Sequence, residues 1–221
     1  MKPRTAIAHY EVFAKEYDQS SKKHEWFSPE ILFGLMFEYV KNKEKLLDLG
    51  IGTGQSAMPF HAIGLKIYGL DGSNEMLKKC KRKAIADELK LFDLSTTPPL
   101  PYKNNSFKYI ISNGVFYFFE NLESFFSEAK RILKPNGFFA FTVENLKSGY
   151  SQKYVNKDND LISKRIIKKV GVEVFRHSDK YINNLAEKYG FKVLKKLEYF
   201  AYNSPTENKD IYFKAYILKK K

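Results

Sequence analysis

The stretch Leu46-Leu-Asp-Leu-Gly-Ile-Gly-Thr-Gly54 decides the fold of this chain. A short apolar run ends in Asp48, and glycines then follow at every second position, at Gly50, Gly52 and Gly54. This pattern predicts a buried strand that enters a tight turn and then a helix. Such a turn lets the backbone approach a ligand closely, because no side chain stands in the way.

A second apolar run, Lys66-Ile-Tyr-Gly-Leu-Asp71, ends in an acid seventeen positions after Gly54. An acid at about this distance is placed to bind the ribose hydroxyls of a nucleoside at the end of the second strand. The third glycine comes one position too early for the dinucleotide fingerprint, and Asp48 is poorly suited to a phosphate site. The two runs therefore predict a nucleoside-containing cofactor that is cationic and lacks phosphate.

These residues resemble motif I of the class I S-adenosylmethionine (SAM)-dependent methyltransferases, and later segments agree with this family. Residues 91–94 resemble the end of its third strand, 101–113 the stretch into its fourth strand, and 131–141 its fourth helix, turn and fifth strand. The resemblance covers residues 45–145 closely and is nearest to the type 11-like, small-molecule branch. One departure is Lys108, where the family usually carries an aspartate.

The resemblance implies SAM as the cofactor. It assigns the glycine turn to the amino-acid part of SAM, Asp48 to shaping that turn and holding the ammonium group, and Asp71 to the ribose. Met76, Asp93 and the Leu94 backbone are assigned to the adenine. The full set of expected cofactor-binding residues is Tyr10, Tyr17, Asp48, Gly50, Gly52, Gly54, Asp71, Gly72, Met76, Asp93, Leu94 and Asn113.

The resemblance also implies roles for three of these residues, Asn113, Tyr10 and Tyr17. The resemblance places the backbone carbonyl of Asn113 near the amino group of the cofactor. Tyr10 and Tyr17 lie on an amphipathic segment, and the family's N-terminal helices often cover the cofactor. An aromatic face near a cationic sulfur contributes roughly 0.5–2 kcal/mol. The alternative is that both tyrosines belong to a helix stripe that faces the core.

Methyl transfer from a sulfonium is an in-line displacement in which the protein mainly positions two reactants. No catalytic triad or metal cluster is therefore required, and we expect no metal. A hydroxyl or carbon-acid acceptor would need a general base. The candidates for that role are His9, Tyr117, Glu144, Tyr150 and His177, each of which also fits a packing or surface role.

The run Val115-Phe-Tyr-Phe-Phe119 follows the fourth expected strand, where acceptors usually bind in the family. It predicts an aromatic-walled pocket for a small organic acceptor, and a helix packing stripe is the alternative. The family's signature for methylating adenine or glutamine amino groups is Asn/Asp-Pro-Pro-aromatic. Here Asn113-Gly-Val-Phe stands in its place.

Length and composition favour one domain, because 221 residues with 43% hydrophobic side chains can bury one substantial core. The single cysteine, Cys80, excludes an internal disulfide and a cysteine-based metal cluster. No apolar run is long enough to predict a membrane span, and no apolar signal core follows the N-terminus. We expect a cytoplasmic protein.

The net charge of +13 raises the question of nucleic acid. Of the 38 basic residues only five are arginine, the residue on which nucleic-acid readers most depend. The scattered lysines predict a solvated surface, with an RNA-binding face as the alternative. A small-molecule methyltransferase is therefore favoured. An RNA methyltransferase, a non-catalytic SAM-binding protein and a nicotinamide-dependent reductase remain alternatives, and the oligomeric state is open.

Periodicity and turn residues place the expected elements. The expected helices span 6–17, 28–41, 54–64, 74–84, 121–133 and 178–190, and the expected strands span 45–50, 66–71, 88–94, 107–112, 138–144, 191–202 and 210–219, with a short strand at 172–177. Ser28, Ser73 and Ser178 are expected helix caps, and residues 18–24 are expected to form a loop.

This alternation predicts an α/β fold, a Rossmann-like seven-stranded, mostly parallel sheet with helices on both faces and a C-terminal antiparallel hairpin. Within one domain we expect a helical lid (1–44), a cofactor-binding core (45–145), a substrate-side insertion (146–177) and a C-terminal helix and hairpin (178–221). Parallel strands end at one edge. Polar residues at the strand ends are expected to converge there: Asp48, Asp71, Asp93, Asn113 and Glu144.

Overall fold

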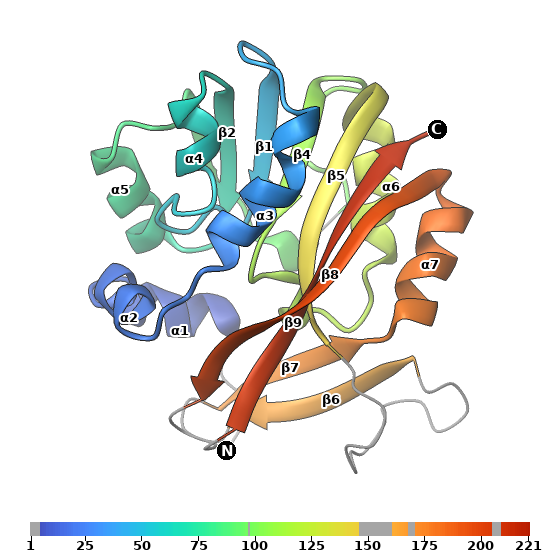
Figure 1. The fold of residues 1–221 in the computed structure, drawn as a ribbon. Helices are drawn as coiled ribbons and strands as arrows, with labels where there is room; N and C mark the ends of the chain where they lie inside the picture. Colours follow the sequence, from blue (N-terminus) through green and yellow to red (C-terminus); the bar gives the residue numbers. More distant parts are fainter. Residues whose placement is uncertain (1–4, 97, 146–160, 168–170, 205–208) are drawn as a thin grey trace.

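The structure is a computed structural model that describes residues 5–96, 98–145, 161–167, 171–204 and 209–221. Its helices are α1 (Ala6–Phe13), α2 (Tyr17–Lys23), α3 (Ser28–Met36), α4 (Met58–Ala62), α5 (Asn74–Arg82), α6 (Glu123–Ile132) and α7 (Asp179–Lys188) (Figure 1). Its strands are β1 (Lys45–Leu49), β2 (Lys66–Asp71), β3 (Glu88–Leu91), β4 (Phe107–Ser112), β5 (Leu133–Asn145), β6 (Ile162–Ile167), β7 (Val172–His177), β8 (Phe191–Ser204) and β9 (Lys209–Lys220). Short 3-10 helices span Phe37–Tyr39, Leu94–Thr96 and Phe116–Phe118.

The described strands form one mixed sheet of nine strands. Its parallel part has the order β3-β2-β1-β4-β5. Beyond β5, the antiparallel β8–β9 hairpin pairs along residues 138–144, while β7 pairs with the end of β5 at 144–145 and carries β6 antiparallel at its side. The α/β class and the C-terminal hairpin are confirmed. The strand count of seven is wrong, because part of the expected insertion forms the β6–β7 hairpin.

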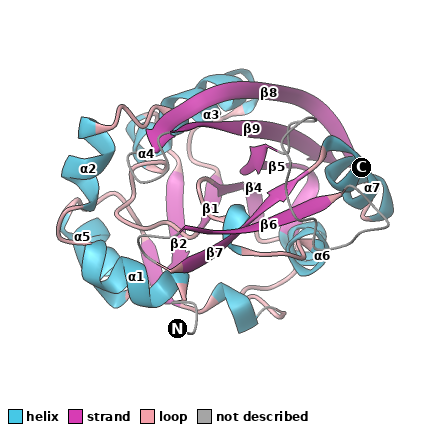
Figure 2. Ribbon diagram, turned by 90° about the horizontal axis from the view of Figure 1, so that it is seen from below, coloured by secondary structure: helices cyan, strands magenta, loops and turns pink. Residues whose placement is uncertain are grey.

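Each face of the sheet carries its own apolar core. Neighbouring residues of a strand point to opposite faces, so Leu46 and Leu47 of β1 contribute to different cores. Helices α3, α4 and α5 cover one face and α6 and α7 cover the other (Figures 1 and 2). In the described part of the chain, no helix is long and apolar enough to cross a membrane.

The strand order reverses between β1 and β4, since β2 and β3 lie on one side of β1 while β4 and β5 lie on the other. At such a reversal the loops that follow the two strands leave in opposite directions and open a crevice beyond their carboxyl ends. The glycine turn follows β1 at this point, so the fold places it at the position where open parallel sheets bind ligands.

The N-terminal region differs from the expected single helix and loop. The chain forms α1 and then α2, so residues expected to be loop are helical. Ser28 is not a helix cap: it is the first residue of α3, and its hydroxyl instead bonds Asn113 and Tyr199. The helix expected at 54–64 is limited to α4. Within the expected insertion (146–177), residues 146–160 and 168–170 lie outside the described residues.

Ser178 caps α7 as expected, because its hydroxyl accepts the backbone N–H of Tyr181 at 3.2 Å. Replacing it by alanine is expected to lower the free energy of unfolding by about 1 kcal/mol, since the first turn loses its side-chain acceptor. Ser178→Asn keeps an acceptor oxygen and is the matched control in urea denaturation. Equal stabilities of the alanine and asparagine variants would show that this cap does not stabilise the fold.

Candidate active site

A cavity of about 830 Å³, open solvent included, lies at the carboxyl ends of β1, β2 and β4 beneath α1 and α2. Ten of the twelve expected cofactor residues line it: Tyr10, Tyr17, Gly50, Gly52, Asp71, Gly72, Met76, Asp93, Leu94 and Asn113. From the aromatic run, Val115, Phe118 and Phe119 also line it. The remaining lining residues were not expected from the sequence: Ala6, Ile7, Trp26, Ile51, Thr53, Gln55, Ser56, Ser73 and Gly114.

Asp71 ties the glycine turn to the end of β2. Its two carboxylate oxygens accept the backbone N–H groups of Gly52 and Ser73, each at 2.8 Å. Gly50 and Gly52 both have positive φ (+77° and +55°), which glycine adopts without strain. Burial raises the pKa of Asp71 above its usual value, and the two N–H groups oppose that shift. The carboxylate therefore sits at the cavity wall in a fixed orientation.

Asp48 does not line the cavity, contrary to the expected convergence. It shares a face of β1 with Leu46 and is buried under the turn, where its Oδ2 has no hydrogen-bond partner among the described residues. Burial, and then the charge of Asp71, raise its pKa well above the usual value. Gly54 also lies outside the cavity. A Cβ there would come within 2.9 Å of Cys80 Sγ, so its bare backbone allows α5 to pack closely.

A half-buried hydrogen-bond network holds the side chain of Asn113 at the cavity wall. Its Oδ1 accepts the hydroxyls of Ser28 (2.6 Å) and Thr142 (2.9 Å), and its Nδ2 donates to Ser56 Oγ at 3.0 Å. Ser28 is also hydrogen-bonded to the hydroxyl of Tyr199 in β8. Both lone pairs of the Asn113 side-chain oxygen are therefore occupied, so this oxygen serves to fix the residue in place.

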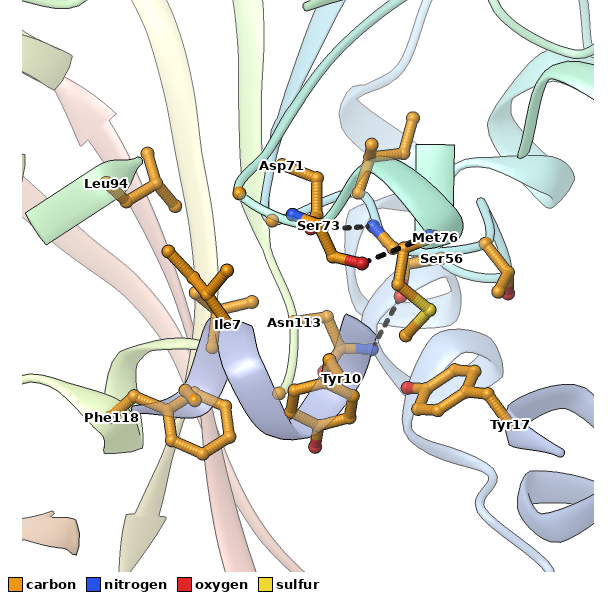
Figure 3. A pocket seen from close by; sticks show the side chains of 18 of the residues that line it. Ile7, Tyr10, Tyr17, Ser56, Asp71, Ser73, Met76, Leu94, Asn113 and Phe118 are labelled. Atoms are coloured by element: carbon orange, nitrogen blue, oxygen red, sulfur yellow. Dashed lines mark hydrogen bonds between the residues drawn. The ribbon is translucent and has the colours of Figure 1, made fainter. Parts of the chain in front are cut away.

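Aromatic rings from α1, α2 and the turn after β4 meet over the cavity. The ring of Tyr10 lies 5.8 Å from that of Tyr17 and 5.7 Å from that of Phe118. The hydroxyl of Tyr10 lies 3.3 Å from that of Tyr117, which is buried behind it. In Figure 3, Tyr10, Tyr17 and Phe118 lie below and Asp71 above, with Asn113 between them.

Two acids attach the N-terminal helices to the cavity rim. Glu11 of α1 accepts the hydroxyl of Ser73, two residues after Asp71, at 2.6 Å. Asp18 of α2 accepts the Thr53 hydroxyl at 2.5 Å and the Gln55 amide at 2.9 Å. Burial alone would raise the pKa of Asp18, but these bonds and the Lys83 ammonium at 2.8 Å lower it. The helices are therefore held by the same loops that shape the cavity.

None of the described general-base candidates lines the cavity, and each has other neighbours in the structure. Glu144 is buried and forms an ion pair with Arg176 at 2.5 Å. His177 is buried with its Nε2 3.1 Å from the Glu120 carbonyl, and burial lowers its pKa to about 4. His9 stacks on Phe13, and Tyr117 is held behind Tyr10. Tyr150 lies outside the described residues.

The charge of the cavity wall fits SAM. The ionisable acids on the wall are Asp71 and Asp93, and no lining residue that the structure describes is a lysine or arginine. Such a wall attracts a sulfonium and disfavours phosphate. The positive-φ glycines leave room for a ligand beside the turn. Among the described residues, no group of three His, Cys, Asp or Glu side chains is arranged to hold a metal ion.

Comparison with known proteins agrees with this geometry. A family model described as a methyltransferase domain matches residues 47–141. An uncharacterised protein of Methanocaldococcus jannaschii is 32% identical over 152 residues, which are 67% of each chain. The matched segments span 23% to 54% of the next three curated relatives, so those proteins are considerably longer than the segment they share.

Solved structures share the fold. A SAM-dependent methyltransferase of Thermotoga maritima has a TM-score of 0.66 at 22% identity, covering 97% of this chain and 99% of that one. The magnesium protoporphyrin IX methyltransferase of Synechocystis was solved with bound S-adenosylhomocysteine (SAH), the demethylated form of SAM. It has a TM-score of 0.62 at 15% identity, covering 87% of this chain and 80% of that one. The chain belongs to the class I SAM-dependent methyltransferases. It is an enzyme of this family, and SAM is its cofactor.

Proposed function

We propose that the chain transfers the methyl group of SAM to a small acceptor that is neutral or positively charged. The observation that carries this proposal is the aromatic wall of the cavity, which consists of Tyr10, Tyr17, Trp26, Phe118 and Phe119. Aromatic faces favour apolar and cationic groups. The charges on the described wall are negative, so a carboxylate or phosphate on the acceptor would find no cation there.

For the cofactor we propose an orientation that follows the chemistry of the wall. The carboxylate of Asp71 accepts the ribose hydroxyls, and the adenine extends towards Asp93 and Leu94. The methionine part lies over the glycine turn, near the backbone of Asn113. SAM supplies an activated methyl group, and the protein contributes by aligning the acceptor with it. Alignment of this kind can supply roughly 7–11 kcal/mol of the barrier.

An RNA acceptor is the alternative, and the position of a lysine cluster argues against it. The pKa of Lys108 is lowered by burial and by the positive charges of Lys41, Lys219 and Lys134. Lys108 and Lys134 lie at the start of β4 and β5, whereas the cavity lies at the ends of the parallel strands. A polyanion bound to this cluster would therefore lie at the edge of the sheet opposite the cavity.

The test of the proposed acceptor class is transfer of labelled methyl from SAM to a metabolite extract and, separately, to total RNA. We expect label in small molecules that do not bind an anion exchanger. Phe118→Ala is expected to lower this transfer about tenfold, because an aromatic contact with the acceptor is lost, while the dissociation constant for SAH stays within about threefold. Phe200→Ala, at a residue of β8 that is 51% exposed, is the matched control.

Three results would contradict the proposal. Nuclease-sensitive label in RNA would favour the RNA methyltransferase, and label only in anionic metabolites would exclude the proposed charge class. Tight binding of SAH with no transfer to either mixture would favour a SAM-binding protein without turnover.

A further inference from the structure

The residue after Asp71 is a glycine, and the space beside it is filled by a side chain from a different element. A Cβ built on Gly72 would lie 2.6 Å from Cδ1 and 2.7 Å from Cγ1 of Ile7. Both distances are far below van der Waals contact, so Ile7 occupies the place that a side chain at position 72 would take. The wall next to Asp71 is therefore supplied by α1 and not by β2.

Ile7 lines the cavity together with Gly72 and Leu94. Figure 3 shows Ile7 and Leu94 on the left side of the view, with Asp71 to the right of Leu94 and above Ile7. Gly72 directly follows Asp71 in sequence, and Ile7 fills the space beside this glycine. A ribose held by Asp71 would thus carry its base along an apolar surface made by one residue of the sheet edge and one of α1.

The position of Ile7 is fixed by polar contacts on the same helix. Glu11, one turn further along α1, accepts the Ser73 hydroxyl at 2.6 Å and lies 3.4 Å from the backbone nitrogen of Glu75. Ser73 directly follows Gly72 and is the N-cap of α5, and Glu75 lies in the first turn of that helix. A larger residue at position 72 would push α1 away from these partners. The contacts of Glu11 therefore depend on the glycine at position 72.

We propose that Ile7 is a cofactor-binding residue that packs against the adenine of SAM, in the space that Gly72 leaves open. The proposal rests on the ribose position proposed above, at Asp71. It implies that the apolar wall for the base is complete only while α1 is packed against the loop after β2. The contact is to the nucleoside, so it acts on SAM, on SAH and on adenosine alike.

Calorimetry with SAH and with adenosine tests the proposal. Ile7→Ala is expected to weaken both ligands about tenfold, because the base loses the apolar contact of a branched side chain. Val12→Ala is the matched control, since Val12 lies on the same helix, is also β-branched and is 67% exposed. This control is expected to bind both ligands within about twofold of the unmodified chain.

A second variant separates direct contact from mere support of α1. In Gly72→Val/Ile7→Ala, the valine fills the vacated space from the sheet side, and SAH affinity is expected to recover at least threefold over Ile7→Ala. The proposal would be overturned if Ile7→Ala bound SAH and adenosine as tightly as Val12→Ala does. It would also be overturned if only the affinity for SAH fell, or if the double variant did not regain affinity for SAH. These readouts use no acceptor, so failure here is distinct from failure of the proposed acceptor class.

Discussion

Replacing Asp71 by alanine is expected to lower the affinity for SAM and SAH by about 100-fold or more, because the two charge-assisted hydrogen bonds that we propose between Asp71 and the ribose would contribute roughly 1.5–3 kcal/mol each. The two backbone N–H groups that the carboxylate accepts, from Gly52 and Ser73, hold it in place before the ligand arrives. Little reorganisation is then needed on binding, which is why the expected loss is large.

Asp71→Asn refines this experiment. The amide keeps the shape of the side chain but replaces one oxygen by an N–H donor, which would face a backbone N–H. An intermediate loss of affinity is therefore expected. Asp87→Ala is the control, since Asp87 also accepts a backbone N–H at 2.8 Å, from Ile67, but does not line the cavity. If Asp71→Ala bound SAM and SAH within about threefold of the unmodified chain, Asp71 would not be a cofactor-binding residue.

The sequence predicted the part of the cavity wall that depends on strand ends. Asp71 and Asn113 end or follow parallel strands, and a parallel sheet places all such positions at one edge. Gly50 and Gly52 carry a backbone conformation that other residues rarely adopt, so their spacing alone indicates the turn. These features are local in sequence, and the structure brings all four residues to the cavity.

The same rule failed for Asp48 and Glu144, because strand alternation decides which face a side chain takes. Asp48 shares its face with Leu46 and is buried beneath the turn. Glu144 is turned towards Arg176 of β7, a strand that the sequence indicated only as a short segment. The position of a residue along a strand was predictable, whereas its access to the cavity depended on pairing partners that periodicity does not reveal.

The wall supplied by the N-terminal helices was the least predictable part. Ile7 and Trp26 line the cavity because α1 and the turn after α2 pack against loops far away in sequence. Asp18 was expected in a polar loop, yet it lies in α2 and contacts Thr53 and Gln55. Such contacts join residues more than thirty positions apart, and nothing in the local pattern of either segment specifies them.

The second large effect is expected in the pH dependence of stability and comes from His177. Its ring is fully buried at the end of β7 and stacks on Tyr181. The Glu120 carbonyl can only accept, so Nε2 carries the proton in the neutral ring. Nδ1 has no hydrogen-bond partner among the described residues, so a second proton there would be buried without an acceptor. This explains why burial lowers the pKa from the usual 6.5 to about 4.

The unfolded chain binds this proton once the pH falls below 6.5, whereas the folded chain does so only near pH 4. The contribution of His177 to stability is therefore complete above pH 6.5 and is lost as the pH falls to about 4. A pKa shift of this size corresponds to about 3 kcal/mol, at roughly 1.4 kcal/mol for each unit. Below the folded-state pKa no further loss from His177 is expected.

His177→Gln is expected to abolish the contribution of His177 to the pH dependence of the free energy of unfolding. The measurement is urea denaturation at a series of pH values. The raised pKa values of Asp48 and Asp71 act with the opposite sign, since each favours the folded state as the pH falls. The informative quantity is therefore the difference in free energy of unfolding between the unmodified chain and the variant at each pH. His61→Gln, at an exposed histidine, is the control and should leave the profile unchanged. A difference that stays constant from pH 6.5 to 4 would mean that His177 has the same pKa in the folded protein as in the unfolded chain, and that its burial does not control acid stability.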